Sequence, residues 1–208
     1  MSDFRSYGRE SLPPVVKYLI IVNVCVYIAQ LVLDPLINLT FRYLALHPVN
    51  SPNFSPYQVF THMFTHSPGN FFHIIFNMFG LWMFGKVLEQ FWGGKRFLNF
   101  YLICGIGGAI LHLLMQYVMG NYGPAVGASG AVMGIFVAFA YLFPNTPLML
   151  MFIPVPIKAK YLVMGLIAFD LFGGFSGGGN IAHFAHLGGA ITGFIMVWIW
   201  NRDRSRFY

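Results

Sequence analysis

Charged residues are scarce in this 208-residue sequence: they make up 9% of it, against a hydrophobic fraction of 57%. Soluble domains usually carry about 25% charged residues, so the composition excludes an ordinary soluble domain. Long apolar segments recur along the chain, which predicts an all-α polytopic membrane protein. No short basic stretch leads to a small-residue cleavage site near the N-terminus, so a removable signal peptide is not expected.

Cysteine is also rare. The two cysteines, Cys25 and Cys104, each lie inside an apolar segment. A cysteine in such a place usually acts as a small hydrophobic packing residue, so we expect no disulfide between them. The pair therefore says little about the redox state of the compartment.

Six apolar segments approach the length of about 20 residues that a bilayer core requires. The sequence thus predicts a single six-span membrane domain over residues 1–208, with cytoplasmic tails at about 1–14 and 202–208. The outer connection 37–68 is half apolar and is expected to rest partly in the interface, and the glycine-rich connection 173–180 could move as a lid. The expected spans are 15–36, 70–88, 96–118, 127–143, 159–175 and 183–201.

The basic residues predict the orientation of the bundle. If the N-terminus is cytoplasmic, eleven of the twelve Lys and Arg residues fall on the cytoplasmic side, and only Arg42 lies outside. Cytoplasmic connections normally carry this excess, so both termini are expected inside (N-in, C-in). The net charge of +6 then reflects topology and contact with the lipid bilayer, and no nucleic-acid partner is expected.

With this topology, the first turns of the second, fourth and sixth spans lie at one depth near the outer surface. They carry His73 with Asn77, then Ser129, then His183 with His186. Polar residues inside a membrane are costly and usually functional. The sequence therefore delivers a hydroxyl, imidazoles and a carboxamide to one layer.

Small-residue patterns follow two of these polar residues. A G-x-x-x-G pattern begins at Gly130, directly after Ser129, and another begins at Gly189, three residues after His186. Such patterns let helix backbones approach closely, so we expect the fourth and sixth helices to bring Ser129 against His186. A serine hydroxyl is a poor nucleophile until a base accepts its proton, and His186 would supply that base.

His73 and Asn77 lie one helical turn apart and share a face. Both can donate hydrogen bonds, and the backbone N–H of Ser129 at a helix N-terminus adds a third donor. Donors aimed at a developing oxyanion are usually the largest catalytic contribution. The predicted chemistry is acyl transfer by a serine nucleophile, which needs no cofactor.

Plainer interpretations exist for each group. Ser129 could be a packing residue, and His73 with Asn77 could be an interhelical hydrogen-bonded pair. His183 and His186 could bind a metal ion with His73, because an i, i+3 pair suits ligation. No acidic residue is expected near them and no cysteine is in reach, so no metal site is predicted. The other histidines are expected to be interfacial (His62, His66) or structural (His47, His112).

Several stretches together resemble the rhomboid family of intramembrane serine proteases. They are "HIIFNM" at 73–78, "GASGAVMG" at 127–134 and "AHLGGAITG" at 185–193, with "THMFTH" at 61–66 and "GKVLEQFWGGKRFLNFY" at 85–101. The likeness covers most of the chain from about residue 15. It implies a six-transmembrane-helix rhomboid-like bundle.

The resemblance also implies the roles of individual residues. Ser129 would be the nucleophile of a Ser–His dyad without an acid. His186 would be the base, rather than His183, because His186 stands in the A-H-x-x-G context. The oxyanion group would comprise His73, Asn77, the Ser129 N–H and Gly127.

Three further residues carry expectations. Met133 stands where family members often have an aromatic residue against the catalytic imidazole, so a looser imidazole is expected. Asp170 on the fifth span could be the acid of a triad, but a dyad does not require it, and a lone intramembrane carboxyl is expected to be hydrogen-bonded or protonated. Glu89, at the inner end of the second span, is expected to be a structural hydrogen-bond anchor.

The expected function is that of an intramembrane serine endopeptidase, which cleaves transmembrane protein substrates near the outer membrane face. A substrate would enter sideways past the fifth helix. The alternative is a pseudoprotease-like protein that binds or retains membrane clients. A transporter is disfavoured because the polar residues gather at one depth. The small size and short termini favour a bacterial plasma membrane.

Overall fold

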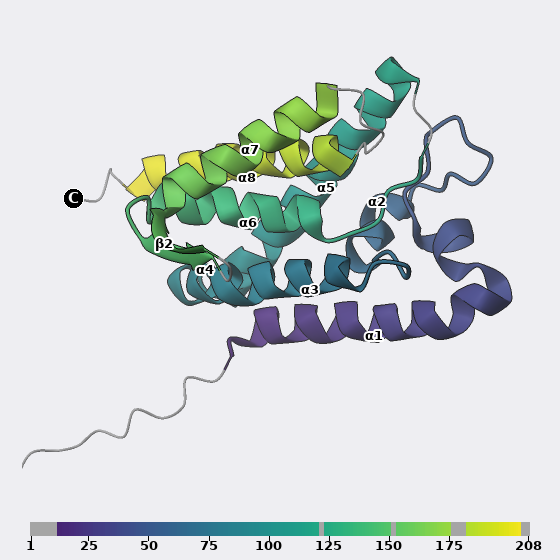
Figure 1. Ribbon diagram of the computed structural model, residues 1–208, viewed down its shortest axis with the longest axis horizontal. Helices are drawn as coiled ribbons and strands as arrows, with labels where there is room; N and C mark the ends of the chain where they lie inside the picture. The colour runs from purple at the N-terminus through teal and green to yellow at the C-terminus, as the bar shows by residue number, and fades with distance from the viewer. Residues whose placement is uncertain (1–11, 121–122, 151–152, 176–181, 205–208) are drawn as a thin grey trace, which may run out of the picture.

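The computed structural model describes residues 12–120, 123–150, 153–175 and 182–204, and its helices lie side by side in one bundle (Figure 1). Two π-helical stretches (η1, η3) and a 3₁₀ turn (η2) accompany the α-helices. The elements in chain order are α1 (Pro14–Ile37), η1 (Thr40–Leu44), α2 (Gln58–Thr61), η2 (His62–Phe64), α3 (Phe71–Gly80), η3 (Leu81–Gly85), α4 (Lys86–Trp92), α5 (Gly94–Met119), α6 (Ser129–Leu142), β1 (Pro147–Leu150), β2 (Ile153–Lys158), α7 (Ala159–Phe175) and α8 (Ala182–Arg204).

A helix occupies each of the six segments expected from the sequence. The second is one continuous helical segment, Phe71–Trp92, in which η3 joins α3 to α4. The antiparallel hairpin of β1 and β2 was not predicted. Neither were the short helices η1, α2 and η2 in the outer connection. The α-helical architecture is therefore confirmed, with additions in two connections.

The chain is an integral, multi-pass membrane protein. Among the described residues, four helical segments are long and apolar enough to cross a membrane: Pro14–Ile37, Phe71–Trp92, Gly94–Met119 and His183–Arg202. Large hydrophobic side chains face outward from these helices and from α7, where Phe172 is 77% exposed. The 14 residues of α6 rise only about 21 Å, less than the roughly 30 Å of a bilayer core.

The helices alternate in direction along the bundle. In Figure 1, α3, α6 and α8 begin at the right-hand end, and α1, α5 and α7 end there. The start of α1 and the end of α8 both lie at the left-hand end. The first turns of α3, α6 and α8 therefore share one end of the bundle, as the sequence predicted.

Glycines allow α6 and α8 to touch backbone to backbone. A Cβ atom on Gly189 would lie 1.8 Å from the carbonyl oxygen of Gly130, and one on Gly193 would lie 2.7 Å from Cα of Gly134. The two G-x-x-x-G patterns thus face each other, which confirms the close packing predicted for these two helices, whereas a contact between Ser129 and His186 stays a prediction. The α5 helix joins this contact through Gly108, whose Cβ would lie 2.7 Å from a carbonyl oxygen of α8.

Hydrogen bonds tie the outer connection to the bundle. The buried amide of Gln30 on α1 donates to the Thr40 hydroxyl and to the His66 carbonyl, both at 2.7 Å, and accepts from the His66 N–H at 3.0 Å. Farther along, Leu46 and Ala125 exchange two backbone hydrogen bonds of 2.8 and 2.9 Å. The outer connection therefore holds the segment that leads into α6.

Glu89 is the structural anchor that the sequence predicted. Its buried carboxylate accepts hydrogen bonds from the N–H groups of Val15 at 2.9 Å and Val16 at 2.7 Å. These N–H groups lie in the first turn of α1, where a helix offers them no internal acceptor. A negative charge at this position also complements the helix dipole.

Replacing Glu89 with alanine is expected to destabilise the protein by about 1.5–3 kcal/mol, the usual contribution of a hydrogen bond to a charged group. Thermal unfolding of the purified protein in detergent measures this loss. Glu89→Gln retains a carbonyl acceptor of the same shape and should lose less. Equal melting temperatures for the alanine variant and the wild type would contradict the anchoring role.

Candidate active site

Ser129 is the first residue of α6 and is partly buried. Backbone N–H groups at a helix N-terminus have no internal acceptor and favour negative charge nearby. The backbone just before Ser129 is held by the outer connection, because the Gly127 N–H donates to the His62 carbonyl at 2.9 Å. That bond engages the Gly127 N–H, so Gly127 can serve the site only through its conformation and its small size.

Gly127 makes room for His73. Its φ of 128° lies in a region that side chains rarely adopt. A Cβ at Gly127 would lie 2.7 Å from Nε2 of His73 and 3.5 Å from Oγ of Ser129. His73 Nε2 and Ser129 Oγ therefore lie on the same side of Gly127, in the space that a side chain would fill.

The partners of His73 fix its tautomer. Its Nδ1 faces the backbone N–H of Ser67 at 3.4 Å, a long contact in which Nδ1 can only accept. In a neutral imidazole the proton then resides on Nε2, the atom beside Gly127 and Ser129. Asn77 donates one N–H to the His73 carbonyl at 2.7 Å and retains a second amide hydrogen.

His186 belongs to the first turns of α8, and its side chain is 25% exposed. It lies within electrostatic range of His73. Its Nδ1 is 3.0 Å from Oδ1 of Asp170 on α7. A carboxylate oxygen accepts, so Nδ1 carries a proton, and in a neutral imidazole Nε2 then bears the lone pair.

Asp170 corrects the expectation that no acidic residue lies near the paired histidines. Its side chain is 4% exposed, and Oδ1 also meets His183 Nδ1 at 2.7 Å. The ligand atoms of Asp170, His183 and His186 lie within 4.8 Å of one another, a spacing that a metal ion would tolerate. The carboxylate contacts were missed because they depend on how α7 packs against α8.

His62 and His66 are buried, so the expectation that they are interfacial is wrong. His62 Nδ1 contacts the Gln58 carbonyl at 2.9 Å. The His66 ring packs edge-on to the His73 ring, with centroids 5.2 Å apart. His66 thus supports the ring placed beside Ser129.

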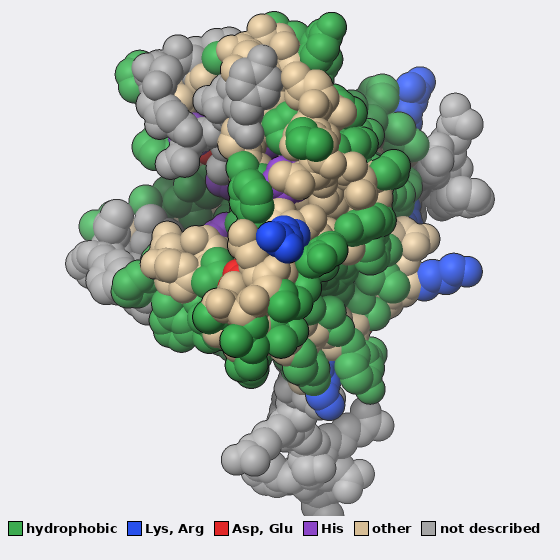
Figure 2. Space-filling model, turned by 90° about the vertical axis from the view of Figure 1, so that its right-hand side faces the viewer, with side chains coloured by type: hydrophobic (Ala, Val, Ile, Leu, Met, Phe, Trp, Pro, Cys, Tyr) green, Lys and Arg blue, Asp and Glu red, His purple; other side chains and the backbone are tan. Residues whose placement is uncertain are grey.

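Other expectations concern the surroundings of His186. Met133 is buried in the core, and the His186 ring lies edge-on to His183 with centroids 6.4 Å apart. Of the expected lid 173–180, residues 173–175 belong to α7, and the rest lies outside the described residues. Figure 2 looks onto this end of the bundle and shows histidine side chains exposed between hydrophobic ones.

Acidification is expected to destabilise the fold through the two buried histidines of the outer connection. Burial lowers the pKa of His62 to about 4, and burial together with nearby His73 lowers the pKa of His66 to about 3. Between these values and 6.5 the unfolded chain binds more protons than the native protein. Stability therefore falls as the pH drops, by about 2 kcal/mol per histidine at pH 5.

Denaturant unfolding of the protein in micelles at pH 7.5, 6 and 5 (roughly spanning the usual pKa of histidine) checks this dependence. His66→Phe is the matched control, because both ring nitrogens of His66 lack a hydrogen-bond partner among the described residues. That variant should show a shallower dependence on pH than the wild type. A flat wild-type profile would contradict the argument.

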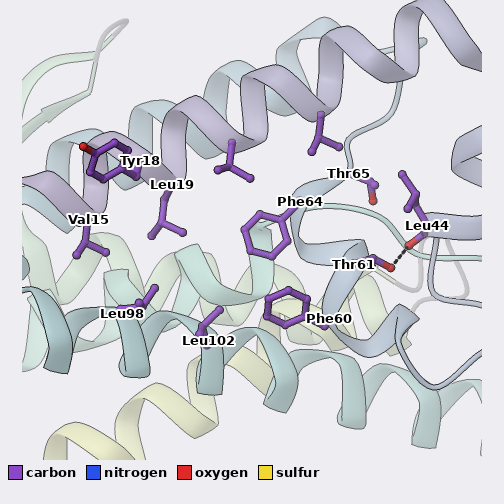
Figure 3. A pocket seen from close by; sticks show the side chains of 12 residues that line it. Val15, Tyr18, Leu19, Leu44, Phe60, Thr61, Phe64, Thr65, Leu98 and Leu102 are labelled. Carbon is purple, nitrogen blue, oxygen red and sulfur yellow. Dashed lines mark hydrogen bonds between the residues drawn. The ribbon is translucent and has the colours of Figure 1, made fainter.

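An apolar groove of about 610 Å³ lies elsewhere, between α1, the outer connection and α5 (Figure 3). Phe60 and Phe64 point into it, opposite Leu19 of α1 and Leu102 of α5. Its lining contains neither Ser129 nor a histidine. The groove is therefore separate from Ser129 and from the histidine cluster.

Comparison with known proteins matches the profile of the rhomboid domain to residues 53–203. Rhomboid protein 1, mitochondrial, of Saccharomyces cerevisiae is 33% identical over 130 residues, which cover 62% of this chain and 38% of that protein. Presenilin-associated rhomboid-like protein, mitochondrial, of Homo sapiens is 32% identical over 157 residues, covering 75% and 40%. RHOMBOID-like protein 12, mitochondrial, of Arabidopsis thaliana is 32% identical over 149 residues, covering 65% and 44%.

The chain thus spans about two fifths of the length of these relatives. All three are mitochondrial by name, which conflicts with the expected bacterial plasma membrane, and that expectation is withdrawn. The profile match covers most of the chain and includes Ser129, His186 and both glycine patterns. This chain belongs to the rhomboid family.

Proposed function

We propose that this protein is an intramembrane serine endopeptidase with Ser129 as nucleophile and His186 as general base. The convergence of three helix starts carries this proposal. They bring His73 beside Ser129 and within electrostatic range of His186. The hydrogen-bond partners of the two imidazoles set opposite tautomers, so His73 Nε2 is a donor and His186 Nε2 an acceptor. A serine protease site needs a hydrogen-bond donor for the oxyanion and an acceptor for the serine proton.

Acylation follows from these roles. Ser129 Oγ attacks the carbonyl carbon of the scissile bond while His186 Nε2 accepts the hydroxyl proton. The oxyanion receives hydrogen bonds from His73 Nε2–H, from the second amide hydrogen of Asn77 and from the Ser129 N–H. The intermediate then collapses, and His186 donates its proton to the leaving amine as the C–N bond breaks.

Deacylation repeats the sequence with water. His186 accepts a proton from a water molecule, whose oxygen attacks the acyl ester on Ser129. The ester bond breaks, Ser129 recovers its proton, and the new carboxyl terminus leaves. Exposure of histidines at this end of the bundle provides a route for that water (Figure 2).

The short α6 supports a site below the membrane surface. If the C-terminal end of α6 meets the inner boundary of the hydrocarbon, its length of about 21 Å leaves Ser129 about 10 Å below the outer boundary. We propose six spans with both termini inside, because the two described chain ends share one end of the bundle. The excess of basic residues on that side supports the same orientation.

Substrates are proposed to be transmembrane segments of membrane proteins in the same bilayer. The α7 helix packs on α8 at the edge of the bundle, so a segment could reach His186 by passing it. A helical carbonyl is hydrogen-bonded within its own helix, so the segment must unwind before Ser129 can attack. Residues that weaken a helix are therefore expected near the cleaved bond.

Labelling with a fluorophosphonate probe tests the proposal. The wild type should be labelled, and Ser129→Ala and His186→Ala should not, while all three melt at similar temperatures. Ser51→Ala is the matched serine control, because Ser51 lies in the outer connection and its hydroxyl contacts only a loop N–H among the described residues. It should be labelled like the wild type.

A folded wild type that resists the probe would overturn the proposal, provided that another intramembrane serine protease is labelled in parallel. That outcome would favour a client-binding protein on the same scaffold. Labelling that persists in Ser129→Ala would mean that a different nucleophile reacts.

A further inference from the structure

We propose that Asp170 is a positioning residue that completes a Ser129–His186–Asp170 relay, in place of the dyad that the sequence implies. This inference rests on the proposed protease function. Asp170 is on α7, and its side chain is buried in the bundle, with 4% exposed. A buried carboxylate needs partners, and here both are imidazoles of α8.

The first contribution of Asp170 is to orient the base. Its Oδ1 accepts a hydrogen bond from His186 Nδ1 at 3.0 Å. A proton held on Nδ1 leaves Nε2 of a neutral imidazole free to accept the Ser129 proton. Without this acceptor, the His186 ring could adopt the other tautomer, in which Nε2 carries the proton and cannot act as a base.

The second contribution is electrostatic. When His186 accepts the Ser129 proton, its ring becomes an imidazolium in a partly buried site. The Asp170 carboxylate at 3.0 Å stabilises that charge as it forms. The benefit arises in the transition state, so it raises kcat and leaves the binding of substrate largely unchanged.

His183 holds the carboxylate in place. Its Nδ1 donates to the same Oδ1 at 2.7 Å, and its ring lies edge-on to Phe169 with centroids 5.8 Å apart. A Cβ on Gly173 would lie 2.5 Å from His183 Nε2, so the absence of a side chain there admits the ring. Asp170 is therefore fixed by a second donor, which rigidifies the contact with His186.

This arrangement couples the base to α7. Asp170 and Gly173 are on α7, whereas His183 and His186 are on α8. A displacement of α7 that admits substrate would also move the carboxylate away from His186. The base is then fully oriented only when α7 packs against α8, which links catalysis to closure around the substrate.

The decisive comparison is between Asp170→Asn and Asp34→Asn. Asp34 on α1 is half-buried and accepts a hydrogen bond from the Thr40 N–H, and no histidine is among its hydrogen-bond partners in the described residues, so it controls for the loss of one hydrogen-bonded carboxylate. For cleavage of a transmembrane substrate, Asp170→Asn should lower kcat at least tenfold, with KM within about twofold. The upper limit is the roughly 10⁴-fold loss seen when a triad aspartate becomes asparagine.

Fluorophosphonate labelling should slow in parallel with kcat in Asp170→Asn, and Asp34→Asn should behave like the wild type. Asp170→Glu restores a carboxylate and should recover part of the activity. An Asp170→Asn enzyme with wild-type kcat would overturn the relay. If Ser129→Ala also remained active, the protease proposal itself would fail, so the two failures are distinguishable.

Two measurements keep the proposal testable if Asp170→Asn does not fold. Nitrogen-15 NMR of histidine-labelled wild type should show His186 with its proton on Nδ1, and a proton on Nε2 would overturn the proposal. The second is activity in EDTA and in added Zn²⁺. Loss in EDTA with recovery in Zn²⁺ would show that Asp170, His183 and His186 hold a metal ion instead, which also overturns it.

Discussion

Alanine at Ser129 or at His186 is expected to reduce kcat for a transmembrane substrate by about 10⁶-fold, the effect of removing either member of a unit that acts together. The hydroxyl alone cannot attack without a base, and the base alone has no nucleophile to activate. The double variant should therefore be no slower than either single variant. Cleavage of a fluorogenic transmembrane substrate in bicelles measures all three rates.

Non-additivity is the diagnostic part of this result. If the two residues acted independently, the fold-losses in kcat of the single variants would multiply in the double variant. That result would contradict a shared proton transfer. A small residual rate is expected in each variant, because His73, Asn77 and the Ser129 N–H still stabilise an oxyanion attacked by water. Melting temperatures close to that of the wild type would show that the losses are chemical.

The helices could be predicted because long apolar segments indicate burial in lipid. Their alternating directions could be predicted because the basic residues indicate which helix ends share one side. The same patterns predicted that α3, α6 and α8 begin at one end of the bundle. The contact between α6 and α8 was predictable because only glycine permits such close backbones, at Gly130 and Gly189. Glu89 was predictable as an anchor because a carboxylate near the end of an apolar helix needs nearby donors.

The β1–β2 hairpin could not be predicted from its residues. Pro147, Pro154 and Pro156 interrupt both strands, and proline cannot donate to a sheet ladder. In a two-stranded hairpin every residue is on an edge, so these prolines can be accommodated. The same residues are equally consistent with an irregular loop. Only the pairing of β1 with β2 makes this segment a hairpin.

Asp170 shows why the site was incompletely predicted. Asp170 precedes His183 by 13 residues in the chain. This separation does not predict a contact unless α7 and α8 are known to pack as neighbours with their adjoining ends together. A usable signal existed, because a short connection makes consecutive helices antiparallel and aligns the last turns of one with the first turns of the next. His62 and His66 were misjudged because exposure in the interface and burial beneath a folded loop look alike in sequence.

Replacing Gly189 with alanine is expected to be the most disruptive single-methyl change among the glycines of the described residues. The added Cβ would lie 1.8 Å from the Gly130 carbonyl oxygen, whereas real Cβ contacts are longer than 3.0 Å. Both groups belong to backbone, so no side-chain rotation can relieve the clash, and α6 must move more than 1 Å from α8. A shift of that size in a catalytic constellation costs about 100-fold in rate.

The same separation removes dispersion contacts along the α6–α8 interface, so the variant should also be destabilised by about 3 kcal/mol or more. Gly165→Ala is the matched control, because Gly165 lies on α7 and, apart from its chain neighbours and its own helix backbone, no atom comes within 4 Å of its added Cβ. Alanine favours a helix over glycine by about 0.8–1 kcal/mol, so this control should be active and slightly more stable. The contact between Gly130 and Gly189 would be refuted by a Gly189→Ala enzyme that melts and cleaves like the wild type, because such a protein has space at that position for a methyl group.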